Sequence, residues 1–189
     1  MKDDWIGAGI LKKSKHPKEW QGIPQKDMVP YRRYVNREKP GFCGTYSAAA
    51  LIHYLVKHQR NHEIDMMRLL SALEGKIDRR SIYDGTYHFD VVNGLNDLLA
   101  DDEYQAHVRY RHRKLIIDEL SKEAPLPVII GSLSLFGSKY GNHWLLAYSY
   151  GYNEDGQLFY KCYDNHGRIN AVIPANQVGI AIWLERKDR

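Results

Sequence analysis

The sequence predicts an α+β fold in which N-terminal helices pack on a C-terminal antiparallel sheet. Apolar residues recur at helical spacing in the first two thirds of the chain, whereas the last third reads as a series of short strands. A turn signal, Asn-Glu-Asp-Gly at 153–156, separates two of these strands. A chain of 189 residues with 43% hydrophobic and 26% charged residues has the size and composition of one globular domain. We expect an N-terminal arm over 1–27 and a single domain over 28–189.

The expected elements follow the chain in that order. Apolar periodicity predicts helices over 43–58, 64–73, 88–99 and 114–122. Residues 28–31 are expected to form a short edge strand, because proline is tolerated at the edge of a sheet. The remaining strands are expected at 104–110, 128–130, 144–152, 158–163, 171–173 and 179–184.

Charge and hydropathy exclude several classes of protein. The net charge of +4 is small and the cationic residues are scattered, which does not favour a nucleic-acid partner. No apolar run of about 18 residues is present, so we expect no membrane span. The first residues, Met-Lys-Asp-Asp-Trp, lack the apolar core of a signal peptide. Two locations stay open: the cytoplasm, or secretion if a leader has been removed.

The cysteine and histidine content argues against structural metals and a disulfide framework. The chain has two cysteines, and a bridge between Cys43 and Cys162 would remove any nucleophile. On a strand Cys162 shares a face with Asp164, although a small apolar sheet residue is its ordinary role. His53, His58 and His62 recur near helical spacing, but no cysteine or carboxylate pattern completes a metal site. We therefore expect no metal and no organic cofactor.

The stretch around Cys43 is the strongest functional signal. The turn signal Pro40-Gly41 runs into Phe42 and Cys43, and strong helix formers follow. The pattern places Cys43 in the first turn of a helix, where unpaired backbone N–H groups and the helix dipole favour an anion. A thiol in that position is expected to have a lowered pKa, as a cysteine nucleophile requires. A small buried cysteine that opens a core helix is the alternative.

Two further residues complete a possible catalytic set. His143 follows a glycine-rich loop at the start of a strand, where a neutral imidazole is suited to act as general base. The next strand returns antiparallel and ends at Asp164, which places Asp164 beside His143. A carboxylate there can accept the second imidazole N–H and fix its tautomer.

These motifs together resemble the papain-like cysteine peptidases. The segment Cys-Gly-Thr-Tyr-Ser-Ala-Ala from Cys43 resembles the start of the catalytic helix in the bacteriocin-processing, double-glycine leader peptidase-like family of bacteria. Gly-Asn-His-Trp at 141–144 and Asp-Asn-His-Gly at 164–167 resemble two other segments of that family. The resemblance covers about residues 28–185. It implies a papain-like fold and the roles of nucleophile for Cys43, general base for His143 and orienting acid for Asp164.

The sequence departs from this family at two places. His166 stands where the family has a tryptophan. The family also has an oxyanion-hole glutamine before the cysteine, and no glutamine occurs between Gln25 and Cys43. Tyr34 occupies the aligned position and Asn36 is the nearest side-chain amide, so either is a candidate oxyanion donor.

The function expected from these residues is hydrolysis of a peptide bond by a thiol peptidase or amidase, with a peptide or protein as substrate. Three alternatives share the fold. The first is a catalytically silent domain that binds a peptide or protein. The others are an acyltransferase and a cell-wall peptide hydrolase with the same triad. The sequence leaves the oligomeric state open.

Overall fold

A computed structural model describes residues 15–78, 85–110 and 112–187 of the chain. The helices are α1 (Gln25–Met28), α2 (Cys43–Tyr54), α3 (Met66–Ile77), α4 (His88–Leu98) and α5 (Arg113–Leu120). A π-helical turn, Leu55–Gln59, extends α2, and 3-10 turns cover η1 (Val29–Arg33), η3 (Ser134–Phe136) and η4 (Ala175–Gln177). No helix of the described residues is both long and apolar enough to cross a membrane.

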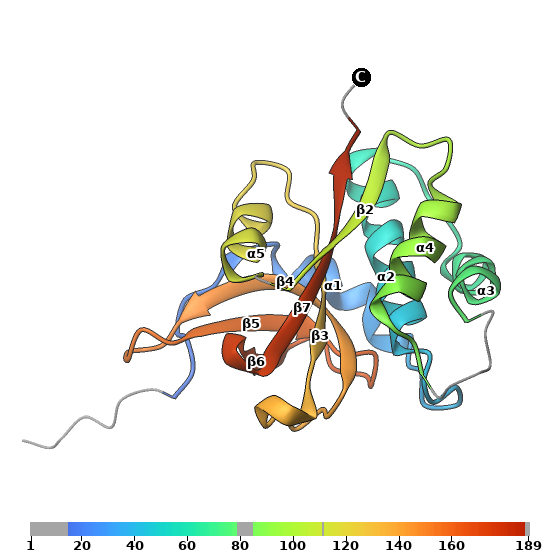
Figure 1. Ribbon diagram of the computed structural model, residues 1–189. Coiled ribbons are helices and arrows are strands. Elements are labelled where there is room, and N and C mark those ends of the chain that lie inside the picture. The colour runs from blue at the N-terminus through green and yellow to red at the C-terminus, as the bar shows by residue number, and fades with distance from the viewer. Residues whose placement is uncertain (1–14, 79–84, 111, 188–189) are drawn as a thin grey trace, which may run out of the picture.

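A seven-stranded antiparallel sheet forms the rest of the fold. Its strands are β1 (Gln21–Gly22), β2 (Tyr104–Arg109), β3 (Val128–Ser132), β4 (His143–Tyr152), β5 (Leu158–Tyr163), β6 (Ala171–Pro174) and β7 (Val178–Arg186). The strand order is β2-β7-β3-β4-β5-β6, and β1 pairs with β4. In Figure 1, α2, α3 and α4 lie together on one side of β3 and β7, and α5 lies on the other side. This architecture confirms the predicted α+β fold of helices against an antiparallel sheet.

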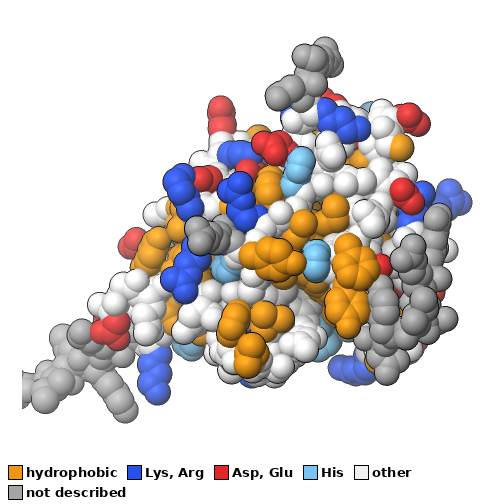
Figure 2. All heavy atoms as spheres, in the orientation of Figure 1, with side chains coloured by type: hydrophobic (Ala, Val, Ile, Leu, Met, Phe, Trp, Pro, Cys, Tyr) orange, Lys and Arg blue, Asp and Glu red, His pale blue; other side chains and the backbone are white. Residues whose placement is uncertain are grey.

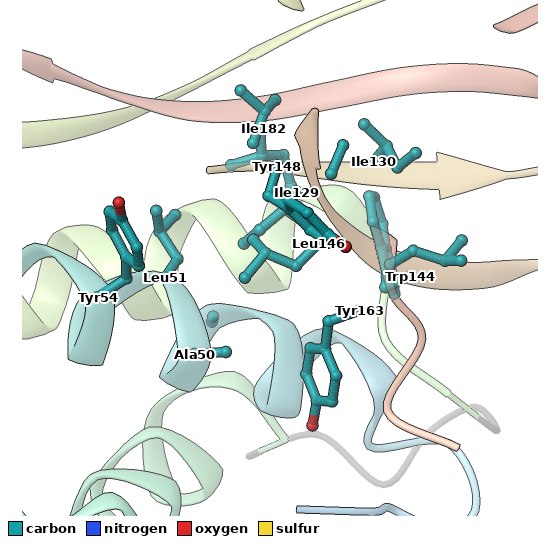
Figure 3. Close-up of a cluster of buried hydrophobic side chains, with 14 of the residues drawn as sticks. Ala50, Leu51, Tyr54, Ile129, Ile130, Trp144, Leu146, Tyr148, Tyr163 and Ile182 are labelled. Atoms are coloured by element: carbon teal, nitrogen blue, oxygen red, sulfur yellow. The ribbon is translucent and has the colours of Figure 1, made fainter. Parts of the chain in front are cut away.

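Helix α2 packs the helical layer against the middle strands of the sheet. Ala48, Ala49, Ala50 and Leu51 are fully buried, so the middle of this helix has no solvent-exposed apolar face. Side chains from α2 meet side chains from β3, β4, β5 and β7 in one cluster (Figure 3). Burial of this apolar surface is the main favourable term that holds the helix on the sheet, and it fixes where the helix begins.

The β4–β5 hairpin positions two of the predicted site residues. Its turn is closed by Asn153, whose Oδ1 accepts the backbone N–H groups of Asp155 at 3.0 Å and Gln157 at 2.9 Å. The strands pair from Tyr152 with Leu158 to Leu146 with Tyr163, with an irregularity between Ala147 and Ser149. The start of β4 and the end of β5 therefore lie at the end of the hairpin remote from its turn.

Two sequence-based boundaries were wrong. The expected strand at 28–31 is the end of α1 and the start of η1. Pro30 lies in the first turn of η1, where a missing N–H breaks no hydrogen bond. The helix expected to end before Gly75 continues to Ile77, because Leu73 and Ile77 are buried on one face of α3.

Part of the segment expected to be an arm pairs with the sheet. Gln21 lies opposite Tyr150 and Gly22 opposite Ser149, so β1 pairs with the part of β4 that extends beyond its pairing with β3. Ser149 Oγ also donates to the carbonyl of Ile23 at 2.8 Å. The segment before residue 15 lies outside the described residues.

Candidate active site

Cys43 is the first residue of α2 and lines a cavity of about 1050 Å³. The preceding turn depends on Gly41, whose φ of 92° is readily adopted only by glycine. Thr86 holds the turn from the other side, because its Oγ1 donates to the carbonyl of Gly41 at 2.9 Å. The turn therefore delivers Cys43 to the wall of the cavity at the helix start that the sequence predicts.

Burial raises the pKa of the Cys43 thiol, contrary to the lowered pKa expected from its position on the helix. The residue is only 8% exposed, and loss of solvent disfavours the thiolate. Backbone N–H groups of Trp144, Gly44 and Cys43 itself oppose this effect without cancelling it. In the absence of substrate the thiol is therefore expected to be protonated at neutral pH.

Trp144, which lines the same cavity as Cys43, joins the sheet to the loop before α4. Its Nε1–H donates to the carbonyl of Thr86 at 2.7 Å. Gly44 allows the close packing, because a Cβ there would lie 2.9 Å from side-chain atoms of both Thr86 and Val91. Asp78 accepts hydrogen bonds from the hydroxyls of Thr45 and Thr86, which ties the same loop to the start of α2.

His143 begins β4 and lines the same cavity as Cys43. Its Nε2 lies 2.9 Å from the backbone carbonyl oxygen of Asp164. A carbonyl only accepts, so Nε2 carries the proton and Nδ1 keeps a lone pair. Burial lowers the pKa of His143, and the hydrogen bond to Asp164 opposes this shift. The resting imidazole is therefore neutral and has one nitrogen available as a base.

Asp164 lies beside His143, as the hairpin geometry predicts, but its carboxylate makes other contacts. Oδ1 accepts the backbone N–H groups of His166 and Arg168, each at 2.9 Å, and Oδ2 accepts the Tyr140 hydroxyl at 3.2 Å. The acceptor for the imidazole is thus the main chain of Asp164 and not its side chain. The reason is the turn after β5, which uses the carboxylate to cap its own N–H groups.

Asn165 connects the helix and the sheet directly beneath these residues. It is fully buried, and its Nδ2 lies 2.9 Å from the carbonyl of Trp144, 3.2 Å from Ser47 Oγ and 3.4 Å from the carbonyl of Cys43. Its φ of 44° is in the left-handed region, which asparagine tolerates better than most residues. Asn165 therefore fixes the start of α2 against the start of β4.

The two candidate oxyanion donors differ in position. Asn36 is buried and lines the cavity with Cys43, and its backbone N–H donates to the carbonyl of Asn165 at 2.9 Å. Tyr34 is not among the described residues that line this cavity. Its hydroxyl accepts from Arg33 at 2.8 Å, and its carbonyl accepts the hydroxyl of Tyr163. Of the two candidates, Asn36 and not Tyr34 is therefore among the described residues that line the cavity with Cys43.

Part of the rim of the cavity is formed by exposed aromatic side chains. Figure 2 shows hydrophobic side chains gathered in the middle of one face, with a histidine between them. Tyr87 and Tyr110 line the cavity and are exposed, and Phe89 stacks on Tyr87 with ring centroids 5.5 Å apart. The Tyr110 hydroxyl lies 3.3 Å from His88 Nε2, which joins the two sides of this rim. Such a surface suits a ligand with apolar side chains.

Cys162 lies outside the cavity. Both cysteines are free thiols, and Cys162 is fully buried between its partners Ala147 and Ala171 in the sheet. Burial raises its pKa well above the ordinary value. Its environment is that of a small apolar sheet residue.

Three features of this site are absent from the sequence-based expectation. They are the interlayer hydrogen bonds of Asn165, the bond from Trp144 to Thr86, and the ring of His166 against His143. The sequence does contain a signal for the first, because an asparagine within an Asp-Asn-x-Gly turn is a common choice for a left-handed residue. The other two join segments that only the folded chain brings together.

Comparison with solved structures supports the fold. The bromelain protease from Ananas comosus, solved in complex with the E64 inhibitor, matches with a TM-score of 0.56 and 11% identity over 88% of this chain and 99% of that chain. A recombinant stem bromelain precursor matches with a TM-score of 0.55 and 10% identity over 89% of this chain and 71% of that chain. No protein-family model and no curated protein sequence matches the chain. The fold is therefore papain-like.

Proposed function

We propose that this protein is a cysteine peptidase or amidase that hydrolyses a peptide bond with Cys43 as nucleophile and His143 as general base. The observation that carries the proposal is the hydrogen bond from His143 Nε2–H to the Asp164 carbonyl, in a cavity that Cys43 also lines. This bond leaves Nδ1 as the basic nitrogen. The papain-like fold and the peptidases that share it add support.

The chemistry starts from a neutral thiol and a neutral imidazole. His143 Nδ1 takes the thiol proton as Cys43 Sγ attacks the substrate carbonyl, and the backbone N–H of Cys43 and the Asn36 amide stabilise the oxyanion. The imidazolium then gives its proton to the leaving amine, and an acyl-enzyme forms. Water, deprotonated by the same imidazole, attacks the acyl group, and the acid product leaves as the thiol regains its proton. Asp164 orients the ring throughout.

The direct test is product analysis on a peptide library. We expect new peptide termini to form at neutral pH, and prior alkylation of Cys43 with iodoacetamide to abolish them. The rim of Tyr87, Phe89 and Tyr110 leads us to expect cleaved peptides enriched in apolar residues near the scissile bond. Absence of cleavage across the library would contradict the proposal and favour the silent peptide-binding domain, for which the missing glutamine is the supporting observation.

A second arm of that test separates hydrolysis from acyl transfer. Addition of a primary amine to the reaction supplies an alternative acceptor for the acyl-enzyme. We expect free carboxylate products to dominate at low amine concentration. Amide products in excess of acid products would instead assign the site to an acyltransferase.

The oxyanion role of Asn36 gives a prediction of its own. Asn36→Ala removes the carboxamide of a buried residue of the cavity wall but retains the backbone N–H bonded to Asn165. We expect kcat to fall by about a hundredfold or more with little change in KM, because the donor acts on charge that develops in the transition state. Steady-state kinetics on a cleaved peptide measures this.

Tyr34→Phe is the matched control for Asn36→Ala. It removes the other candidate donor, whose hydroxyl bonds to Arg33. We expect kcat to stay near that of the native protein. A large loss in Tyr34→Phe, with a small loss in Asn36→Ala, would transfer the oxyanion role to the tyrosine.

A further inference from the structure

The ring of His166 lies directly against the ring of His143. Their centroids are 4.4 Å apart and the planes are inclined by 35°. Both residues line the cavity that contains Cys43. His166 itself is solvent-exposed, whereas His143 is buried. A second imidazole thus contacts the proposed base from the side of the solvent.

The turn after β5 holds His166 in this place. Its backbone N–H donates to Asp164 Oδ1 at 2.9 Å, and the residue before it, Asn165, is fully buried. Tyr140 contacts both imidazoles, with centroids 5.8 Å from His143 and 6.4 Å from His166. The three rings form one cluster whose members come from β4, the loop before it and the turn after β5.

We propose that His166 is a positioning residue that holds the His143 ring in place and, when it carries a proton, opposes protonation of His143, so that the base stays neutral as the pH falls. The proposal rests on the function proposed above for its consequence in catalysis. Its physical content, the coupling between two imidazoles, is independent of that function.

The sign of the coupling follows from the charges. Two imidazolium rings at this separation repel, so a proton on one ring disfavours a proton on the other. Burial lowers the pKa of His143, and the neighbouring His166 lowers it further, while the Asp164 carbonyl and carboxylate act in the opposite direction. The charge of a protonated His143 is therefore disfavoured both by burial and by the neighbouring ring.

Most other groups around the two rings do not change charge between pH 5 and 8, so they do not produce the same pH-dependent repulsion. Burial raises the pKa values of Tyr140 and Cys43, so both stay neutral at neutral pH and below. The Asp164 carboxylate is engaged by Tyr140 and by the turn's own N–H groups, those of His166 and Arg168. Arg37, which lines the same cavity, carries a constant charge. A third histidine of the cavity, His88, contacts the rings of Phe89 and Tyr110 at the rim, whereas His166 is the histidine whose ring lies against His143.

The test is an NMR titration of the His143 imidazole in the native protein, in His166→Phe and in His166→Gln. Both variants remove the ionisable group, and phenylalanine retains a ring.

We expect the pKa of His143 to rise by about one unit in both variants. The acidic limb of kcat/KM, which reports the free enzyme, is expected to move upward by the same amount. We also expect kcat at pH 8 to fall several-fold in His166→Gln alone, because only that variant loses the ring that lies against His143.

His62→Phe is the control, because His62 is exposed and lies outside the cavity. It is expected to leave the His143 titration unchanged. A pKa of His143 that is the same in the native protein and in both His166 variants would overturn the inference. If no peptide is cleaved by any of these proteins, the proposed function fails, and the NMR titration still decides whether His166 is coupled to His143.

Discussion

Replacing Cys43 with alanine is expected to lower kcat/KM for peptide hydrolysis by at least about a thousandfold. Sγ of Cys43 is the atom that would bond to the substrate carbonyl, and no other described thiol lines the cavity. The fold should survive, since alanine is a good helix former and the buried apolar residues of α2, Ala48 to Leu51, keep their contacts with the sheet. Steady-state kinetics, with thermal unfolding measured in parallel, checks both statements.

Cys162→Ala is the matched control for this experiment. It makes the same chemical change at a fully buried thiol in the sheet. Removal of one buried sulfur is expected to cost about 1 kcal/mol of unfolding free energy and to leave kcat/KM near the native value. Native-like activity in Cys43→Ala would show that the thiol is not the nucleophile, and equal losses in both variants would indicate a general effect of thiol removal.

Replacing Asn165 with alanine is expected to lower the free energy of unfolding by about 2–4 kcal/mol. The change removes a fully buried amide that bonds to the Trp144 carbonyl, Ser47 and the Cys43 carbonyl. These partners are buried where α2 meets β4, and an unsatisfied polar group at a buried position is costly. Because the same amide ties α2 to β4, the distance between Cys43 and His143 should become less well defined, and kcat should fall as well. Urea unfolding at constant m measures the first effect.

Asn165→Gly separates the effect of losing the side-chain amide from the effect of backbone strain at this position. Glycine adopts the φ of 44° without strain, so this variant is expected to be more stable than Asn165→Ala by about 1 kcal/mol. Asn170→Ala, at an exposed position of the same connection, should change the unfolding free energy by less than about 0.5 kcal/mol. An Asn165→Ala protein with native stability would contradict the role of the amide as a link between the layers.

Local patterns were sufficient to predict most of the fold. The helix from Cys43, the β4–β5 hairpin and the last strands follow from apolar spacing and one strong turn signal, and the structure confirms them. The segment 28–31 was mispredicted because its proline fits an edge strand and a first helical turn equally well. A choice between those two depends on packing, which a single sequence does not contain.

The candidate site could be predicted only in outline. Strand geometry correctly places Asp164 beside His143, but it does not say whether a side chain or a main-chain oxygen receives the imidazole N–H. The pKa of Cys43 was mispredicted, because the helix start was visible in the sequence and the depth of burial was not. Similarly, the contact of His166 with His143 depends on a turn with one left-handed residue, which no spacing rule describes.

The position of the Asn153 turn bears on how such a site can change during evolution. His143 and Asp164 are 21 residues apart in the chain, yet they meet because they occupy the same end of one hairpin. Residues inserted or deleted in pairs at the Asn153 end would lengthen or shorten both strands and leave the other end in register. Related chains can therefore keep the His143–Asp164 contact while the number of residues between the two drifts freely. Relatives of this chain are better sought by the paired ends of the hairpin than by a fixed interval in the sequence.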